Sequence, residues 1–366
     1  MILVNNNPFT PTFGIVPPHL AGRKDILEQM SDAFSGDIGN PNLSTILIGA
    51  RGCGKTALLS CIANEARKHG WIAVTVVATE GMLEDIYQRT LEASAEHINQ
   101  GVHKHLTGIE IAQLLGIEWT YEEQAEGNWR TRMNTLLSEL GDRGIGLAIH
   151  VDEVDASVEE MIQLASTYQL FIGEGRRVSL IMAGLPKHTL DLMDNERVSF
   201  LRRARQRRIG SVSDAEVLRA FLASIEDAGK SIGATALQQA VNATCGYPYM
   251  MQLIGYCAWE SSRNSKEITK EHVEQGITQA ASEFRAGVLD ATFRDMSKGD
   301  RAFARAMIAC GNECTLTNVA KEMGKQTNYA STYKSRLLKQ GVITEMPDGS
   351  FDFALPMLKD YLAEKL

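Results

Sequence analysis

The chain has 366 residues, of which 44% are hydrophobic and 22% are charged, and its formal net charge is −8 at pH 7. This length allows roughly two or three domains, each with its own core. No apolar run approaches the ~20 residues that cross a membrane, and the N-terminal residues lack the basic start and long apolar core of a signal peptide. Because the whole chain is acidic, any contact with nucleic acid has to be local.

Six cysteines are spread along the chain without a C-x-x-C pair. Cys310 and Cys314 stand four positions apart but have no histidine partner, so a zinc site is not indicated. Reduced and mostly buried thiols are typical of a cytosolic protein, and we therefore expect a cytoplasmic location.

The first part of the chain is rich in proline. Four prolines between positions 8 and 18 exclude a continuous helix over residues 1–22, so we expect an extended arm there, followed by a helix over residues 23–34. The arm has two interpretations. It is either a simple linker, or residues 14–17 pack against adenine, with Ile15 as a nucleotide contact.

A phosphate-binding motif follows the first predicted strand. The run at residues 45–48 is typical of a buried strand, and residues 49–56 read GARGCGKT, a complete G-x-x-x-x-G-K-[ST] loop. Apolar residues at helical spacing come next, so strand, loop and helix stand in the order that the motif requires. A chance match within a glycine-rich turn is the alternative, and the flanking elements argue against it.

The residue types of this loop fit phosphate and metal chemistry. Its glycines let the backbone wrap phosphate oxygens and aim N–H groups inward, and the helix N-terminus adds a positive dipole end. We expect Lys55 to reach the β- and γ-phosphates and the Thr56 hydroxyl to bind Mg²⁺. The expected nucleotide-binding residues of the loop are Gly49, Gly52, Cys53, Gly54, Lys55, Thr56 and Ala57.

An acidic motif stands at the end of a later strand. Residues 146–151 form an apolar run that leads into Asp152 and Glu153. An apolar strand that ends in two acids is typical of the Walker B pattern, in which Asp152 holds Mg²⁺ through water and Glu153 polarises the attacking water. A plain acidic turn at a strand end is the alternative. The position of the pair after a complete phosphate loop favours the catalytic interpretation.

Two more strands are predicted, at residues 71–78 and 178–183, and helical segments separate the strands. Strands that alternate with helices indicate a parallel sheet with helices on both faces. Ligands of such sheets bind at the carboxyl ends of the strands, where the phosphate loop and the acidic pair both fall. Residues 80–143 are expected to be mostly helical, and we assign no chemistry to them.

An arginine-rich run with six arginines occupies residues 195–208. It has three interpretations: a solvated basic helix face, an arginine finger directed at a γ-phosphate, or a contact with a phosphate backbone. The finger interpretation involves Arg197, Arg202 and Arg203, one of which would complete the site of a neighbouring protomer.

Two smaller units are predicted after the arginine-rich run. Helical segments between residues 214 and 286 indicate a small lid. From residue 297 on, three helices and a hairpin indicate a winged helix-turn-helix, with ten Lys and Arg against eight Asp and Glu. The helix at residues 327–338 is expected to enter the major groove of DNA, with Lys325 and Arg336 as exposed contacts and Lys334 partly shielded. The alternative is a winged helix that binds protein.

The motifs together resemble a known family. They are Pro8-Phe9, Pro17-Pro18, Gly22-Arg23, the phosphate loop, Asp152-Glu153, Ala183-Gly184-Leu185-Pro186, Phe200-Leu201-Arg202-Arg203 and Gly246-Tyr247-Pro248-Tyr249. In this combination the whole chain resembles bacterial AAA-type ATPases, which are akin to the archaeal and origin-recognition ATPases and to the STAND class. The resemblance implies ATP or ADP and Mg²⁺ as ligands. It implies these roles: catalytic Lys55, Glu153, Arg197 and Arg202, metal-binding Thr56 and Asp152, and nucleotide-binding Pro248.

The sequence departs from the family pattern at two places. The fourth predicted strand ends in Met182 and Ala183, where AAA proteins usually have a polar sensor residue. The lid has Gly246-Tyr247-Pro248 where origin-recognition lids usually offer an arginine, and this is closer to the STAND pattern. The departures favour a nucleotide-operated switch with slow turnover over a processive motor.

The sequence therefore predicts an α/β P-loop NTPase sheet with helices on both faces, then a helical lid and a C-terminal winged helix-turn-helix. The expected domains are residues 1–210, 211–296 and 297–366. The expected function is an ATP-hydrolysing switch that binds double-stranded DNA, with a homo-oligomer or a protein as a possible further partner and no membrane contact. The alternative is a signalling or scaffold switch whose winged helix binds protein. A helicase-like motor is less favoured, because no further nucleic-acid motif is present.

Overall fold

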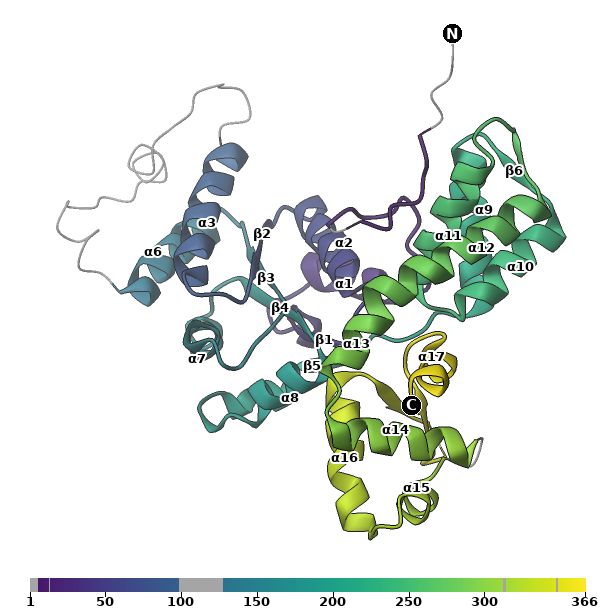
Figure 1. Cartoon of the computed structure of the whole chain (residues 1–366). Coiled ribbons are helices and arrows are strands. Elements are labelled where there is room, and N and C mark those ends of the chain that lie inside the picture. The colour runs from purple at the N-terminus through teal and green to yellow at the C-terminus, as the bar shows by residue number, and fades with distance from the viewer. Residues whose placement is uncertain (1–5, 13, 99–127, 312–313, 347) are drawn as a thin grey trace.

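A computed structural model of the chain, shown in Figure 1, describes residues 6–12, 14–98, 128–311, 314–346 and 348–366. Part of the segment that was expected to be mostly helical, residues 99–127, lies outside the described residues. None of the described helices is long and apolar enough to cross a membrane.

The centre of the fold is a parallel sheet of five strands in the order β2-β3-β4-β1-β5. The strands are β1 (Ser44–Ile48), β2 (Ile72–Val77), β3 (Leu147–Asp152), β4 (Val178–Gly184) and β5 (Arg205–Arg208). The three inner strands are almost entirely buried and mostly apolar, because helices cover both faces of the sheet. Four of the strands were predicted, with ends that differ by one or two residues.

The fifth strand excludes one of the three interpretations of the arginine-rich run, a basic helix face, for residues 205–208. These residues pair with β1 in parallel register, from Arg205 opposite Thr45 to Arg208 opposite Ile48. An edge strand has only one neighbour and one exposed side, so it tolerates a charged sequence that an inner strand would not. The open edge of β1, rather than the local sequence, makes this segment a strand.

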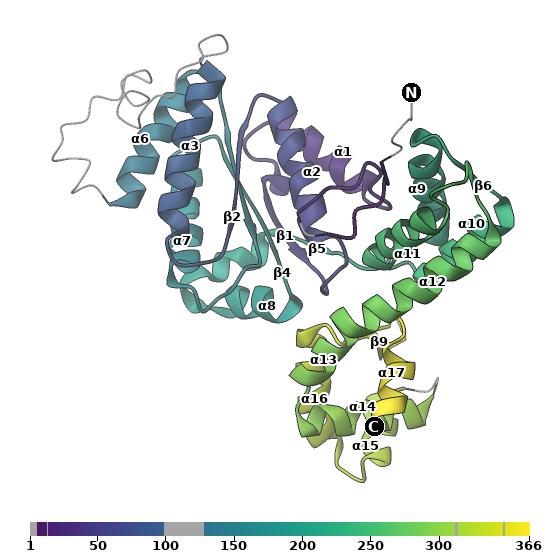
Figure 2. The same cartoon turned by 45° about the horizontal axis from the view of Figure 1, so that its top comes forward.

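Two groups of helices cover the sheet, and alternate strand residues face each group. The helices α1 (Lys24–Ser35) and α2 (Lys55–Lys68) pack on the face that includes Leu47 and Ile181. The helices α3 (Met82–Ile98), α6 (Trp129–Asp142) and α7 (Glu159–Gly173) pack on the opposite face. Figure 2 shows the sheet between these two layers.

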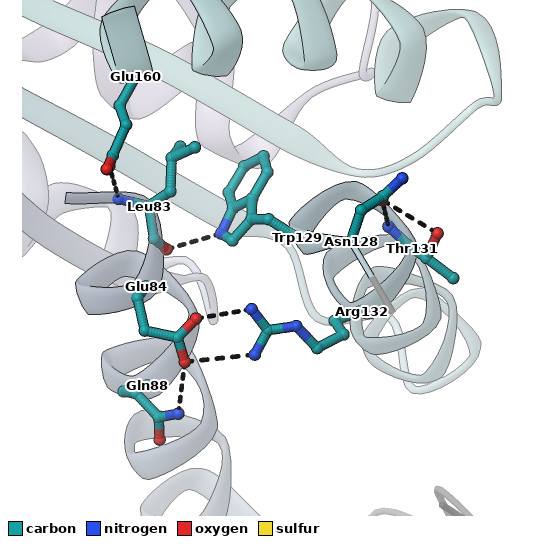
Figure 3. Close-up of polar contacts among 8 residues, drawn as sticks. All are labelled: Leu83, Glu84, Gln88, Asn128, Trp129, Thr131, Arg132 and Glu160. Atoms are coloured by element: carbon teal, nitrogen blue, oxygen red, sulfur yellow. Dashed lines mark hydrogen bonds and ion pairs between the residues drawn. The ribbon is translucent and has the colours of Figure 1, made fainter. Parts of the chain in front are cut away.

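Polar contacts fasten α3 and α6 to each other and to α7 (Figure 3). The Arg132 guanidinium donates to the Glu84 carboxylate at 2.6 Å and 3.3 Å, and it holds the pKa of Glu84 below its usual value. The Trp129 indole N–H donates to the Leu83 carbonyl at 2.6 Å. The Glu160 carboxylate accepts the Leu83 backbone N–H at 2.9 Å, at the first turn of α3. The helix pair is therefore tied to α7, the helix that follows the acidic motif.

After β4 the chain forms α8 (Pro186–Asp194) and the 3-10 segment η2 (Glu196–Arg203), which leads into β5. A helical region then follows. Its elements are α9 (Asp214–Asp227), β6 (Ser231–Ile232), α10 (Ala234–Thr244), α11 (Pro248–Ser261), β7 (Glu267–Ile268) and α12 (Lys270–Phe284). The four helices lie between residues 214 and 286, where helical segments were predicted.

The N-terminal arm packs on this helical region. The Phe9 ring is buried against Phe221, with ring centroids 5.4 Å apart, and lies against Gly255 of α11. The Thr10 backbone N–H donates to the Gln252 side chain at 2.9 Å. This part of the arm belongs to the core of the lid and is not a loose linker. A side chain at Gly255 would meet the Phe9 ring, which explains why that position needs glycine.

The C-terminal region continues α12 without a break. It contains the π-helical turn η3 (Arg285–Leu289), α13 (Asp290–Asp295), α14 (Lys298–Cys310), α15 (Leu316–Glu322), α16 (Thr327–Gln340), β8 (Ile343–Glu345), β9 (Phe351–Phe353) and α17 (Leu358–Lys365). The strands β8 and β9 form an antiparallel hairpin, so helices and hairpin follow the order predicted for a winged helix-turn-helix. One continuous apolar cluster runs from the lid into this region.

Candidate functional site

The loop between β1 and α2 takes a conformation that its glycines allow. Gly52 and Gly54 have φ values of 71° and 86°, in the left-handed region that favours glycine. A Cβ at Gly49 would lie 2.3 Å from the Ile209 carbonyl oxygen. Cys53 is buried, and burial raises the pKa of its thiol, so it is an inert part of the loop rather than a nucleophile. The loop is thus shaped by its backbone, as expected for a phosphate cradle.

The loop and the acidic motif meet through Thr56 and Asp152. The Thr56 hydroxyl donates to the Asp152 carboxylate at 2.6 Å. Asp152 is 8% exposed, and its second oxygen accepts the Glu153 backbone N–H at 2.9 Å. The two predicted metal ligands therefore lie side by side, although they are 96 positions apart in sequence. A hydroxyl and a carboxylate are oxygen ligands of the kind that Mg²⁺ prefers.

The carboxyl end of β4 lies between these two residues. The strand β4 lies between β1 and β3, so the Thr56 and Asp152 side chains have to meet across its carboxyl end. Gly184 stands there, and a Cβ at this position would lie 3.2 Å from the Val154 Cβ. The Gly184 carbonyl accepts the Gly49 N–H at 3.3 Å, which ties the phosphate loop to the end of β4. The apolar residues Met182 and Ala183 are both buried in the sheet.

Lys55 and Glu153 are the two predicted catalytic residues nearest to this pair. The Lys55 ammonium donates to the Gly49 and Ala50 carbonyls at 2.9 Å and 2.8 Å. Glu153 has a φ of 52°, which is uncommon for a residue with a side chain and is frequent at functional sites. Its exposed carboxylate has no hydrogen-bond or ion-pair partner among the described residues. It is therefore free to orient a water molecule.

Asp155 has its own partners and is a less suitable base. Its carboxylate accepts the Ser157 N–H at 2.9 Å and lies 3.6 Å from His188 Nδ1 on α8. The hydrogen bond from Ser157 is the main cause that lowers the pKa of Asp155, and the nearby His188 and Lys187 act in the same direction. No pattern in the sequence indicated the contact between Asp155 and His188.

The first turn of α11 packs directly on the phosphate loop. The Tyr247 hydroxyl donates to the Arg51 carbonyl, and the Tyr249 N–H donates to the Gly52 carbonyl at 3.2 Å. Burial raises the pKa of Tyr247, so its hydroxyl stays protonated and able to donate. Pro248 lies between them, its Cβ 3.8 Å from the position of a Cβ at Gly54. Pro248 is thus beside the loop. Tyr247, which the sequence named only as part of the Gly246-Tyr247-Pro248-Tyr249 motif, is a further contact residue of the loop.

Arg23 is a second residue whose contacts sequence reasoning missed. Its side chain is buried, and burial lowers the pKa of its guanidinium. It donates to the Cys53 carbonyl at 3.3 Å and to the Gly210 carbonyl at 2.6 Å. Arg23 therefore fastens the phosphate loop to the segment that follows β5. Its place in the Gly22-Arg23 motif was the only signal for it.

The contacts of the predicted finger arginines lie away from the phosphate loop. The Ile15 side chain is 53% exposed, and its contact with adenine stays a prediction. Arg197 donates to the Glu159 carboxylate at 2.6 Å, and Arg202 donates to the Met193 carbonyl at 3.1 Å and to Asp194 at 3.3 Å. A role toward a neighbouring protomer stays a prediction for these arginines.

The C-terminal region touches the other side of the phosphate loop. A Cβ at Gly341, just after α16, would lie 3.4 Å from the Ala50 Cα, and Arg51 lies 3.8 Å from Asp295 of α13. Lys339 of α16 lies 3.2 Å from Asp191 of α8. These elements enclose a cavity of about 190 Å³. The loop is therefore in contact with both the lid and the C-terminal region.

The helix α16 corrects one expectation about DNA contacts. Arg336 donates to the fully buried Asp300 carboxylate at 2.6 Å. Its positive charge therefore compensates this carboxylate and is not available to a DNA phosphate. Lys334 donates to Glu345 at 2.8 Å and is largely shielded, as expected. Lys325 remains exposed, 5.7 Å from the Tyr329 ring centroid. The exposed polar residues near the start of the helix are Gln326, Thr327, Asn328, Ser331 and Thr332.

Comparisons with known proteins bear on the fold. Residues 286–362 match the model of a family described as a domain of unknown function (DUF8462), and no curated protein matches the chain. The structure is similar to the ORC2 protein of Aeropyrum pernix in ADPNP-ADP complexes, with a TM-score of 0.62, 13% identity and 97% and 95% of the two chains covered. It is also similar to a Walker-type ATPase of Pyrococcus abyssi, with a TM-score of 0.65, 14% identity and coverage of 94% and 96%.

At these identities the likeness shows the fold alone. The chain has a P-loop ATPase fold like that of these two proteins, with a five-stranded parallel sheet, helices on both faces and a C-terminal helical region.

Proposed function

We propose that this chain is a Mg²⁺-dependent AAA-type ATPase that acts as a slow nucleotide-operated switch and binds double-stranded DNA through its C-terminal helix-turn-helix. The observation that carries the ATPase part is the 2.6 Å hydrogen bond between Thr56 and Asp152. It brings together, next to a complete phosphate loop, the two oxygen ligands that the chemistry needs. The proposed units are residues 1–210, 211–296 and 297–366.

Each residue of the site has a role in this proposal. The loop N–H groups and the Lys55 ammonium bind the phosphates. When nucleotide binds, Lys55 exchanges its hydrogen bonds to the Gly49 and Ala50 carbonyls for contacts with phosphate oxygens. The Thr56 hydroxyl and the Asp152 carboxylate would hold Mg²⁺, which neutralises charge on the phosphate oxygens when it is bound. Glu153 orients and polarises the attacking water with its unpaired carboxylate.

The contacts of the phosphate loop support a switch. Tyr247 and Tyr249 join the loop to the lid, and Arg51 and Ala50 join it to the C-terminal region. A nucleotide that reshapes the loop therefore changes contacts with both regions at once. The end of β4 offers no polar side chain to the site, which agrees with slow turnover.

The start of α16 supports DNA as the partner. Its exposed side chains are short and polar, and such side chains meet base edges or phosphates in helix-turn-helix proteins. The second candidate is a switch whose winged helix binds protein. It is favoured by the pairing of Lys334 and Arg336 with acids and by the 45% exposure of the Tyr329 ring.

The ATPase part is tested by the metal dependence of nucleotide binding. Wild type should bind ATP more tightly with Mg²⁺ than with EDTA, and Thr56→Val should lose most of that difference because it removes one metal ligand. Thr235→Val, at an exposed position on α10, is the matched control and should behave as wild type. Equal metal dependence in all three proteins would refute the metal site.

The DNA part is tested by titrating a duplex over a series of salt concentrations with ATP and with ADP. Binding that depends on the nucleotide and weakens steeply with salt is expected. If no duplex binding occurs at low salt with either nucleotide, the protein-binding candidate replaces DNA.

A further inference from the structure

The edge strand β5 concentrates positive charge on an otherwise acidic chain. Five of the seven residues at positions 202–208 are arginines, and no other seven-residue window of the chain has five basic residues. Among the residues that the structure describes, this strand ends the sheet and pairs with β1 alone, so its outer side has no partner strand there. The whole chain carries a net charge of −8, which makes this edge a local exception.

The arginines of this edge are only partly neutralised. Arg202 pairs with Asp194, and Arg207 donates to the neutral side chains of Gln29 and Asn42. The exposed side chains of Arg203, Arg205 and Arg208 have no ion pair or hydrogen bond among the described residues. Like charges gathered in this way repel each other, and an anionic partner would relieve that repulsion.

The helix α16 itself offers no basic side chain that is free of an acidic partner. All three basic residues of α16 are paired with acids: Lys334 with Glu345, Arg336 with Asp300 and Lys339 with Asp191. Specific binders typically neutralise several phosphates with Lys and Arg. If α16 presents the polar groups that read the bases, the cations that hold the phosphates have to come from elsewhere.

Resting on the proposed DNA binding, we propose that the arginine edge, residues 202–208, is a second contact surface that binds the phosphodiester backbone of the same duplex. The guanidinium group suits this role because its planar set of donors matches a phosphate bidentately. The unpaired N–H groups on the outer side of an edge strand are further donors of the type that bind phosphate oxygens.

The arrangement of α8 places the two surfaces within reach of one duplex. Asp191 in the middle of α8 contacts Lys339 near the end of α16, and Asp194 at the end of α8 contacts Arg202. With nine residues in α8 and 14 in α16, the path along both helices is at most about 35 Å. That path, about one turn of duplex, ends at Arg202, and the edge continues from there through β5 (Arg205–Arg208). A duplex of about three turns is therefore long enough to contact both the edge and the start of α16.

The test compares two double variants in a salt titration of a duplex of roughly 30 base pairs, about three helical turns. Arg205→Gln/Arg208→Gln removes two charges from the edge and keeps it polar. Arg143→Ala/Arg219→Ala removes two exposed arginines elsewhere and is the charge-matched control. None of these four residues belongs to the proposed ATPase site, so ATP hydrolysis without DNA should be unchanged in both variants.

The edge variant should bind the duplex roughly tenfold to a hundredfold more weakly at 0.1 M salt, and its slope of log K against log salt should be shallower by about 1.8. The control variant should keep the wild-type slope. Arg205→Lys/Arg208→Lys should restore most of the slope, because it restores the charges.

Equal slopes in the edge variant and the control would overturn the inference. Self-association of the edge variant in light scattering, together with an unchanged slope, would show that the arginines protect an open strand edge from pairing. The proposed function has a separate point of failure. Wild type that binds no duplex refutes both proposals, whereas wild type whose binding depends on Lys325 but not on the edge refutes only this one.

Discussion

Replacing Arg336 with Gln should destabilise the C-terminal region and leave the salt dependence of DNA binding unchanged. The Arg336 guanidinium donates at 2.6 Å to Asp300 Oδ2, which also accepts the Ser297 N–H at 2.8 Å. Asp300 is fully buried, and its Oδ1 has no hydrogen-bond partner among the described residues. Arg336 is therefore the main charge that compensates this buried carboxylate.

The magnitude follows from burial. Removing one partner of a fully buried ion pair typically costs about 3–5 kcal/mol, and losing a hydrogen bond to a charged group costs about 1.5–3 kcal/mol. The Arg336 side chain is 43% exposed, so water already reaches it and the lower range applies. We expect the free energy of unfolding of the C-terminal region to decrease by about 2 kcal/mol, which changes the ratio of its folded to its unfolded form by roughly thirtyfold.

The assay is native-state hydrogen exchange, which gives the local free energy of opening in α14 and α16 of the full chain. Lys270→Gln is the control, because Lys270 belongs to an exposed pair with Glu274 and should cost under about 0.5 kcal/mol. A salt titration with duplex DNA runs in parallel. Two results for Arg336→Gln would refute the conclusion that Arg336 compensates the Asp300 carboxylate. One is a decrease below about 0.5 kcal/mol in the local free energy of opening. The other is a slope of log K against log salt that is shallower by about 0.9 than in wild type.

Other predictions concern the ATPase site. Lys55→Ala should weaken ATP binding severely, because it removes the cation that binds the phosphates. Lys68→Ala, at the far end of α2, is the control and should bind ATP as wild type does. If a titration with labelled ATP finds wild-type affinity for both variants, the proposed site is rejected. Glu153→Gln should keep ATP binding but slow hydrolysis by ~10²–10⁴ in a phosphate-release assay. Unchanged turnover would mean that another residue orients and polarises the attacking water. Arg197→Ala or Arg202→Ala should lower ATPase activity in a way that depends on protein concentration if one of them acts on a neighbouring protomer. Normal activity of both variants at every concentration would leave them as basic surface residues.

The local parts of the site could be predicted from the sequence. The phosphate loop needs glycines within a short stretch, and the acidic pair follows an apolar strand, so residue type and spacing were enough for Gly52, Lys55, Asp152 and Glu153. The alternation of apolar strands with helices was enough for the parallel sheet and for placing these residues at one edge of it. The order of the C-terminal helices and hairpin followed from periodicity and turn residues.

The tertiary structure alone decided which distant residues meet. The segment with Arg205 forms a strand because it pairs with the free edge of β1. No local sequence pattern predicts that pairing. Arg336 looked like a free cation on a helix face, but Asp300 on another helix holds it. The contact of Tyr247 with the Arg51 carbonyl joins positions 196 apart. Periodicity fixes the face on which a side chain lies, but only the packing of whole elements determines what it faces.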